Sequence, residues 1–187
     1  MKKILTILFS VLIFNGFSQN NSNPMPDNKF DLMFGTGVTF LGTGDYLCLT
    51  FENELNYKLS SYFTTSAVFN MGKSLTGASD GSASFFEGNL NLFISPFRNN
   101  RLNNFRIGAG ISVFNVNDTY LSSSYYCEWM TCNEYIVDKH TTFGGSFILE
   151  DFFRIGRQFF IGAKVFLKPY VNGDINSGAM AKFGIRL

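Results

Sequence analysis

Apolar and polar side chains alternate along the last stretch of this chain, residues 177–187. Ala179, Phe183 and Leu187 share one face, whereas Lys182 and Arg186 occupy the other. Such a period of two indicates a β-strand, because successive side chains point to opposite sides of a sheet. The strand reaches the final residue without a polar tail, so it needs a neighbour along both edges and an apolar solvent on one side. We therefore expect it to pair with the first strand and close a barrel.

Seven earlier segments show the same two-faced pattern. The predicted strands are 30–40, 46–57, 62–72, 83–97, 105–114, 135–150 and 158–168. Their lengths suit tilted strands that cross a bilayer, which need about 9–11 residues. Short turns at 58–61, 98–104 and 151–157 alternate with longer loops at 72–82, 115–134 and 169–176, and only the loop at 41–45 is short. This pattern predicts an all-β fold, an eight-stranded antiparallel up-and-down transmembrane β-barrel with both termini in the periplasm.

The polar face of these strands carries charges of both signs. Because eight strands enclose only enough space for side chains, we expect a packed polar core and not an open pore. Unpaired charges in such a core would be costly, so acids and bases should pair. The predicted lumen charge network consists of Asp31, Glu52, Glu54, Glu87, Arg106, Glu150, Lys164, Lys168, Lys182 and Arg186.

The N-terminus has the features of a secretory signal peptide. Lys2 and Lys3 precede an apolar run over 4–14, and small residues stand before a cleavage point at Gln19. The run is too short for a membrane-spanning helix, which needs about 20 residues. We expect residues 1–18 to be the signal peptide, 19–28 a polar periplasmic lead-in and 29–187 the barrel. The barrel would lie in the outer membrane of a Gram-negative bacterium.

The amino-acid composition agrees with a barrel and suggests few other classes of protein. The 187 residues include 23 Phe and 18 Gly, which suits strands joined by polar loops in one domain. A formal net charge of +1 gives no electrostatic reason to propose nucleic acid as a partner. The Gly-x-Gly segments 35–37 and 108–110 precede no helical pattern, so we expect no phosphate-bearing cofactor, and no other cofactor motif occurs. A soluble lipocalin-like barrel that binds a small ligand is the alternative fold, and it would need the apolar face inside.

The signal peptide, the alternating strands and the terminal sequence AKFGIRL together resemble the small outer-membrane β-barrel family of the OmpA/OmpX type. The resemblance covers 30–187 as a pattern and includes no catalytic motif. It implies membrane lipid as a partner, and recognition of the C-terminal strand by the barrel-assembly machinery. Family members usually end in Phe or Trp, whereas this chain ends in Leu187.

The longest predicted loop contains two cysteines and several aromatic residues. Cys127 and Cys132 lie in YYCEWMTC, and an exported protein permits a disulfide between them, with free thiols as the alternative. One His and two Cys fall short of a structural zinc set, so we expect no metal. Tyr125, Tyr126 and Trp129 suit recognition of an extracellular protein or glycan, although they could instead rest on the barrel rim.

His140 is the only histidine, and Asp138 and Thr142 share its predicted face. Some outer-membrane lipid A deacylases combine a His-x-Ser pair with a Glu on the lipid-facing surface. This chain has His140-Thr141-Thr142 instead, and the alternation points His140 inward, so we expect a hydrogen-bonded lumen histidine and no enzyme. The function that we predict is a structural and surface-interaction scaffold with exposed loops, and the alternative is a narrow solute channel.

Overall fold

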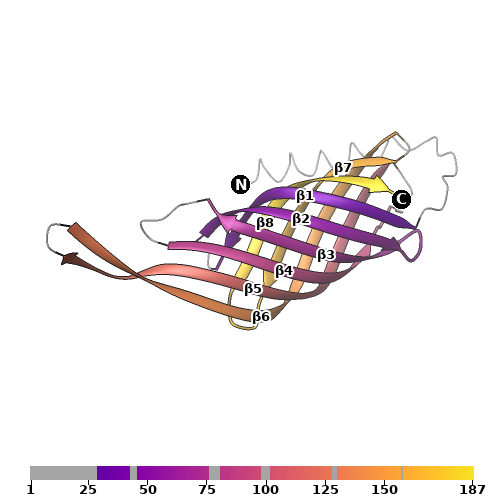
Figure 1. The fold of residues 1–187 in the computed structure, drawn as a ribbon. Helices are drawn as coiled ribbons and strands as arrows, with labels where there is room; N and C mark the ends of the chain where they lie inside the picture. Colours follow the sequence, from indigo (N-terminus) through magenta and orange to yellow (C-terminus); the bar gives the residue numbers. More distant parts are fainter. Residues whose placement is uncertain (1–28, 43–45, 76–80, 98–101, 128–129, 157) are drawn as a thin grey trace, which may run out of the picture.

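The computed structural model describes residues 29–42, 46–75, 81–97, 102–127, 130–156 and 158–187, with side chains described outside 120–134. These residues form eight antiparallel strands in one closed barrel in which sequence neighbours pair. The predicted fold class is therefore confirmed (Figure 1). No helix in this part of the chain is long and apolar enough to cross a bilayer. The strands are β1 (Phe30–Leu41), β2 (Tyr46–Lys58), β3 (Phe63–Ser74), β4 (Gly81–Ile94), β5 (Asn103–Cys127), β6 (Met130–Ile155), β7 (Phe159–Pro169) and β8 (Ile175–Arg186).

The first and last strands close the barrel, as the alternation at the C-terminus predicted. The β1–β8 register places Asp31 opposite Arg186 and Phe34 opposite Phe183. The backbone N–H of Leu187 then donates to the carbonyl of Phe30 at 3.0 Å, so pairing continues to the last residue of the chain. Every strand consequently has a neighbour on both sides within the barrel wall, and no backbone edge faces lipid there.

The outer surface of the wall is apolar, and the interior carries the charges. Side chains that alternate with buried polar ones are exposed on every strand, as expected where an apolar solvent surrounds a barrel. This orientation is the reverse of what a lipocalin-like barrel requires. The exposed set includes Phe34, Phe51, Phe69, Leu90, Ile107, Ile111, Phe147, Ile161 and Phe183.

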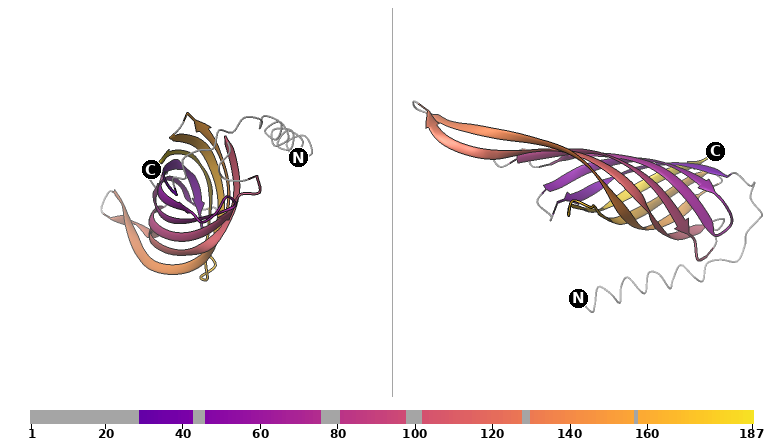
Figure 2. Two further views of the ribbon diagram at one scale, coloured as in Figure 1. Left: turned by 90° about the vertical axis from the view of Figure 1, so that its right-hand side faces the viewer. Right: turned by 90° about the horizontal axis from the view of Figure 1, so that it is seen from below.

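Residues 115–127 and 130–134 belong to strands and not to a loop, so this part of the prediction was wrong. Strands β5 and β6 continue as a hairpin that extends well beyond the other strands, and β4 stays paired with β5 as far as Tyr120 (Figures 1 and 2). The hairpin is defined here as residues 115–142. Its outward positions change from Val113 and Phe143 to the polar pair Asn115 and Thr141, whose side chains are hydrogen-bonded at 2.7 Å. The alternation therefore disappears where the strands leave the apolar belt, although their pairing continues.

The interior is packed but not wholly polar, which corrects the prediction of a polar core. Arg106 lies over the rings of Phe93 and Phe152, with its Cζ 4.2 and 4.7 Å from their centroids. Glycine leaves room for one of these rings, because a Cβ at Gly108 would lie 2.4 Å from a carbon of Phe93. Buried aromatic rings therefore fill the space between the charged side chains.

Candidate functional site

Six charged side chains form a network at the centre of the lumen. Arg106 bridges two strands, with its Nη2 2.6 Å from Glu54 and its Nε 2.5 Å from Glu150. On the facing wall, the Nζ of Lys164 lies 2.8 Å from Glu52, and the Nζ of Lys182 lies 2.9 Å from the same residue. Lys182 also contacts Glu54 and lies 3.1 Å from Glu150. The network therefore links β2, β5, β6, β7 and β8.

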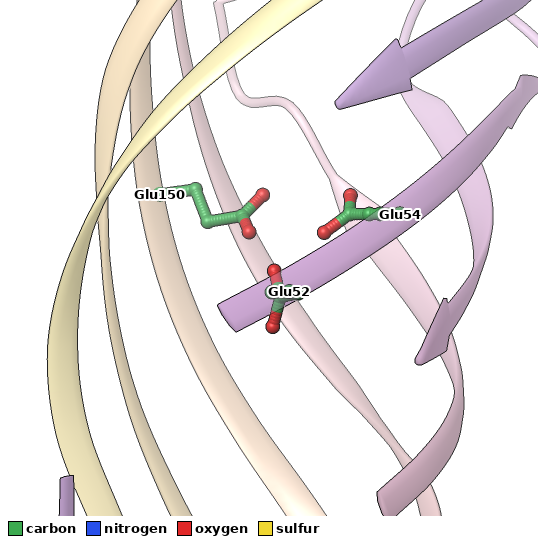
Figure 3. A group of neighbouring side chains, drawn as sticks. All are labelled: Glu52, Glu54 and Glu150. Atoms are coloured by element: carbon green, nitrogen blue, oxygen red, sulfur yellow. The ribbon is translucent and has the colours of Figure 1, made fainter. Parts of the chain in front are cut away.

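Three carboxylates converge in this network, as a metal site would require. Glu52, Glu54 and Glu150 each place an oxygen within 4.8 Å of the others (Figure 3). The guanidinium of Arg106 and the ammonium groups of the two lysines surround them, so three positive charges balance three negative ones. A cation would have to displace a lysine or arginine from its carboxylates. We interpret the cluster as structural.

One ion-pair group lies on each side of this network. Towards the hairpin, Glu87 accepts hydrogen bonds from Lys168 at 2.8 Å and from the Tyr170 hydroxyl at 2.9 Å. Towards the C-terminus, Asp31 contacts Arg186 at 3.1 Å and Lys58 at 2.8 Å. The structure thus buries all ten residues of the predicted charge network and places six of them in the central network, with Glu87–Lys168 and Asp31–Arg186 on either side.

Lys58 was missing from the predicted network. Residues 52, 54 and 56 face inward on β2, and the same alternation places Lys58 on that side at the strand end. The sequence prediction assigned it to a turn, where side-chain direction follows no period. Strand boundaries, not the pattern itself, caused this omission.

An apolar cluster fills the lumen at the hairpin end of the barrel. Phe85 and Phe114 pack at 5.5 Å between ring centroids, and Phe114 stacks on Tyr170 at 4.6 Å. Leu41 and Cys48 are buried in the same cluster. This apolar cluster lies between the charged network and the hairpin. Buried side chains thus occupy the hairpin end of the lumen as well as its centre, which favours a packed lumen over a channel.

His140 lies at the base of the hairpin among carboxylates from three elements. Its Nδ1 is 3.5 Å from Asp138, and its Nε2 is 3.2 Å from Asp174 in the β7–β8 loop. Asn172 donates to Asp174 at 2.6 Å and lies 3.2 Å from the same ring nitrogen. Among the described residues, the polar contacts of the imidazole thus include carboxylates and an amide but no hydroxyl nucleophile.

Asp118 completes this cluster from the facing strand, directly opposite Asp138 in the β5–β6 register. Burial raises the pKa of its carboxyl, and the nearby Asp174 and Asp138 raise it further against the opposing effect of His140. The sequence prediction grouped only His140, Asp138 and Thr142. It missed Asp118, although the alternation along β5 places this residue on the same side as the inward-facing Phe114 and Val116. It also missed Asp174, because a loop sequence does not indicate where its side chains point.

The hairpin tip contains the predicted disulfide and aromatic contacts, whose side chains lie outside the described residues. The backbone register places Cys127 opposite Met130 and Cys132 opposite Tyr125, on the same face of the hairpin. Tyr126 lies opposite Thr131, and Trp129 is outside the described residues. The disulfide and the aromatic recognition surface therefore stay predictions, as do the signal peptide and lead-in at residues 1–28.

Solved structures of small bacterial barrels have the same fold. The attachment invasion locus protein Ail of Yersinia pestis matches with a TM-score of 0.61 and 11% identity, over 87% of this chain and 100% of that one. Neisserial surface protein A matches with a TM-score of 0.65 and 8% identity, over 84% and 97%. For the N-terminal β-barrel domain of Pseudomonas aeruginosa OprF the values are 0.50 and 9%, over 82% and 96%.

One of the Ail structures is a complex with the heparin analogue sucrose octasulfate. No family model matches the sequence of this chain, and no curated protein matches it either. The likeness therefore concerns the fold: this chain has the architecture of the small eight-stranded outer-membrane β-barrels.

Proposed function

We propose that this protein is an integral outer-membrane barrel that holds the hairpin at the cell surface as a binding element. The apolar outer wall, the closed β1–β8 seam and the predicted N-terminal signal peptide support this location. The likeness to Ail and Neisserial surface protein A supports it further. In this orientation the C-terminus and the start of β1, which are hydrogen-bonded to each other, face the periplasm, and the hairpin, which lies at the end of the barrel away from the C-terminus, faces outward (Figure 1).

The observation that carries the proposal is the open edge of β6 in the hairpin. Regular pairing of β6 with β7 runs only from Phe147 to Ile155, and an isolated bridge joins Gly144 to Tyr170. For residues 130–142, no strand pairs with this edge in the described part of the chain. An unpaired edge offers backbone donors and acceptors to an extended segment of another protein.

Apolar side chains are exposed beside this edge. Tyr135, Ile136 and Val137 are 44%, 43% and 55% exposed, and as consecutive strand residues they present both faces of the hairpin. A strand of a partner could thus gain main-chain hydrogen bonds and apolar contacts at once. Because no chemistry in the site suggests a reaction, we favour a binding scaffold over an enzyme.

A channel is less well supported than a scaffold. The side chains of Lys164, Lys168 and Lys182 have no exposed area, and neither do those of the glutamates that pair with them. Ion conduction would require these pairs and the apolar cluster to move aside together. The packed lumen instead provides a rigid base for the hairpin.

The experiment compares the full chain with a variant in which residues 121–135 are replaced by Asn-Gly, a two-residue turn that connects Tyr120 to Ile136. Both proteins are placed in lipid nanodiscs, and a display library of random 12-residue peptides is selected on each. Heat-dependent electrophoretic mobility and cell fractionation verify that both are folded in the outer membrane.

We expect the selection to yield peptides that bind the full chain but do not bind the shortened variant. Equal enrichment on both proteins would show that the hairpin is not the binding element. Recovery of the full chain in the periplasmic fraction, without a heat shift in mobility, would contradict the proposed location.

A further inference from the structure

Charge is unevenly distributed between the two ends of the barrel. The segments at the hairpin end, 42–45, 73–82, 115–142 and 169–176, contain seven acidic residues and only Lys73 and Lys139 as bases. The connections at the other end, 58–62, 95–104 and 151–158, contain five basic residues and a single acid, Asp151. The lumen between them carries equal numbers of each sign in its predicted network. The surface proposed to face outward is therefore acidic.

The described carboxylates of this end gather at the base of the hairpin. Asp118 and Asp138 face each other across the β5–β6 pair, and Asp174 approaches from the β7–β8 loop. Like charges placed directly opposite each other in a sheet are destabilising. The Oδ1 atom of Asp118 is buried and has no hydrogen-bond partner within the described part of the chain. These three residues and His140 are called the acidic patch below.

This chain supplies little positive charge to the acidic patch. Among the described residues, His140 is the ion-pair partner of Asp138 and of Asp174, and no lysine or arginine makes an ion pair with the three carboxylates. Lys139 is exposed and occupies the opposite parity on β6, so it faces away from the patch. The side chain of Asp138 is 60% exposed, which leaves its carboxylate accessible to a partner.

We infer that the partner of the hairpin is a basic protein segment, an extended strand that carries lysine or arginine. This inference rests on the proposed function, because the acidic patch adjoins the open edge of β6 at residues 138–142. A strand added along that edge would place alternate side chains on the patch side of the hairpin. Its cationic groups would face Asp138 and Asp174 and reduce the repulsion with Asp118.

The same charge distribution disfavours a sulfated sugar at this site. The Ail structure with sucrose octasulfate shows that a barrel of this fold can hold a polyanion, but an anion approaching the acidic patch of this chain would meet three carboxylates. Electrostatic complementarity selects partners largely by excluding the wrong sign of charge. We therefore expect the two proteins to differ in the partners that they bind.

The test uses the full chain in neutral-lipid nanodiscs and three probes: a ten-residue peptide of alternating lysine and valine, its glutamate counterpart, and sucrose octasulfate. Binding is measured for the wild type, the double variant D138N/D174N and the hairpin-shortened variant. The matched control is Asp151→Asn, which removes an acid at the opposite end of the barrel.

We expect the wild type to bind the lysine peptide alone, with an affinity that falls as salt is added. The double variant should lose about tenfold in affinity, since each exposed charge pair contributes modestly, and Asp151→Asn should lose none. Binding of sucrose octasulfate or of the glutamate peptide as tightly as the lysine peptide would overturn the inference.

Two variants separate this inference from the proposed function. If D138N/D174N binds the lysine peptide like the wild type while the shortened chain does not, the hairpin is the binding element and the charge inference is wrong. If the shortened chain, which keeps all residues of the acidic patch, still binds and the double variant does not, the patch attracts cations without the extended edge. The proposed role of the hairpin would then be wrong.

Discussion

The lumen network and the acidic patch both gather three carboxylates, but they satisfy them differently. In the lumen, Glu52, Glu54 and Glu150 are buried, and lysine and arginine from other strands match each charge. At the base of the hairpin, Asp138 and Asp174 both contact the imidazole of His140, and among the described residues no lysine or arginine makes an ion pair with them or with Asp118. Carboxylates that a chain neutralises by itself hold its own structure together. Those that it leaves without cations are available to something outside it.

Among the variants that test this comparison, Arg106→Ala should have the largest effect on the free energy of unfolding. Truncation in Arg106→Ala would leave Glu54 and Glu150 buried with fewer cations, and breaking one partner of a buried ion pair costs about 3–5 kcal/mol. Urea unfolding in lipid vesicles, followed by circular dichroism, measures the change. Adding Glu150→Gln to the variant should restore part of the stability, because two carboxylates, Glu52 and Glu54, then face two lysines, Lys164 and Lys182. A loss below about 1 kcal/mol would contradict a structural role for the network.

A smaller effect tests how closely strands β1 and β8 pack against each other at Gly37. A Cβ at Gly37 would lie 2.1 Å from the backbone oxygen of Ala179, whereas a Cβ at Gly88 meets nothing within 4 Å. Gly37→Ala should therefore cost about 1–3 kcal/mol of unfolding free energy, the usual range for overpacking. Gly88→Ala is the matched control and should leave stability nearly unchanged. Equal behaviour of the two variants in the same urea assay would mean that β8 leaves room for a side chain at position 37.

The smallest effect is expected in the acidic patch. Because the pKa of Asp118 is raised in the folded protein, its ionised form is disfavoured by folding. The folded state thus holds this proton more tightly than the unfolded chain, and stability falls as pH rises through the two pKa values. Asp118→Asn should stabilise the protein by up to about 1 kcal/mol at pH 7 and have no effect at pH 3, where both states are protonated. Unfolding curves at both pH values measure this, and destabilisation at pH 7 would mean that Asp118 has a stabilising partner.

The same comparison explains which features the sequence could predict. Within the membrane, lipid on one side and packed side chains on the other impose a period of two, so the strands, the closing pair Phe34–Phe183 and the ten lumen charges follow from it. Farther along the hairpin, at residues 135–137, consecutive side chains are exposed, so both of its faces contact water there. Residues such as Asn115, Asn117 and Thr141 then give no alternation, and the extended strands were predicted as a loop.

Other features depend on contacts that no local pattern encodes. An inward position can hold either a charged or an aromatic side chain. The alternation therefore gave no sign that Phe93 and Phe114 belong to apolar clusters inside the lumen. Asp174 reaches His140 from a loop that is 34 residues away in sequence. The alternation predicts the face of a residue, whereas its partners depend on how the whole barrel closes.

The seam between β1 and β8 also determines when this protein can fold. Asp31 and Arg186 meet across a separation of 155 residues, and the last hydrogen bond of the wall belongs to the final residue of the chain. Until β8 is present, the first strand lacks its second neighbour, and an open strand edge cannot enter lipid. The barrel can therefore close in the membrane only when all eight strands are available. A cell that makes this protein must keep these strands from aggregating before they close.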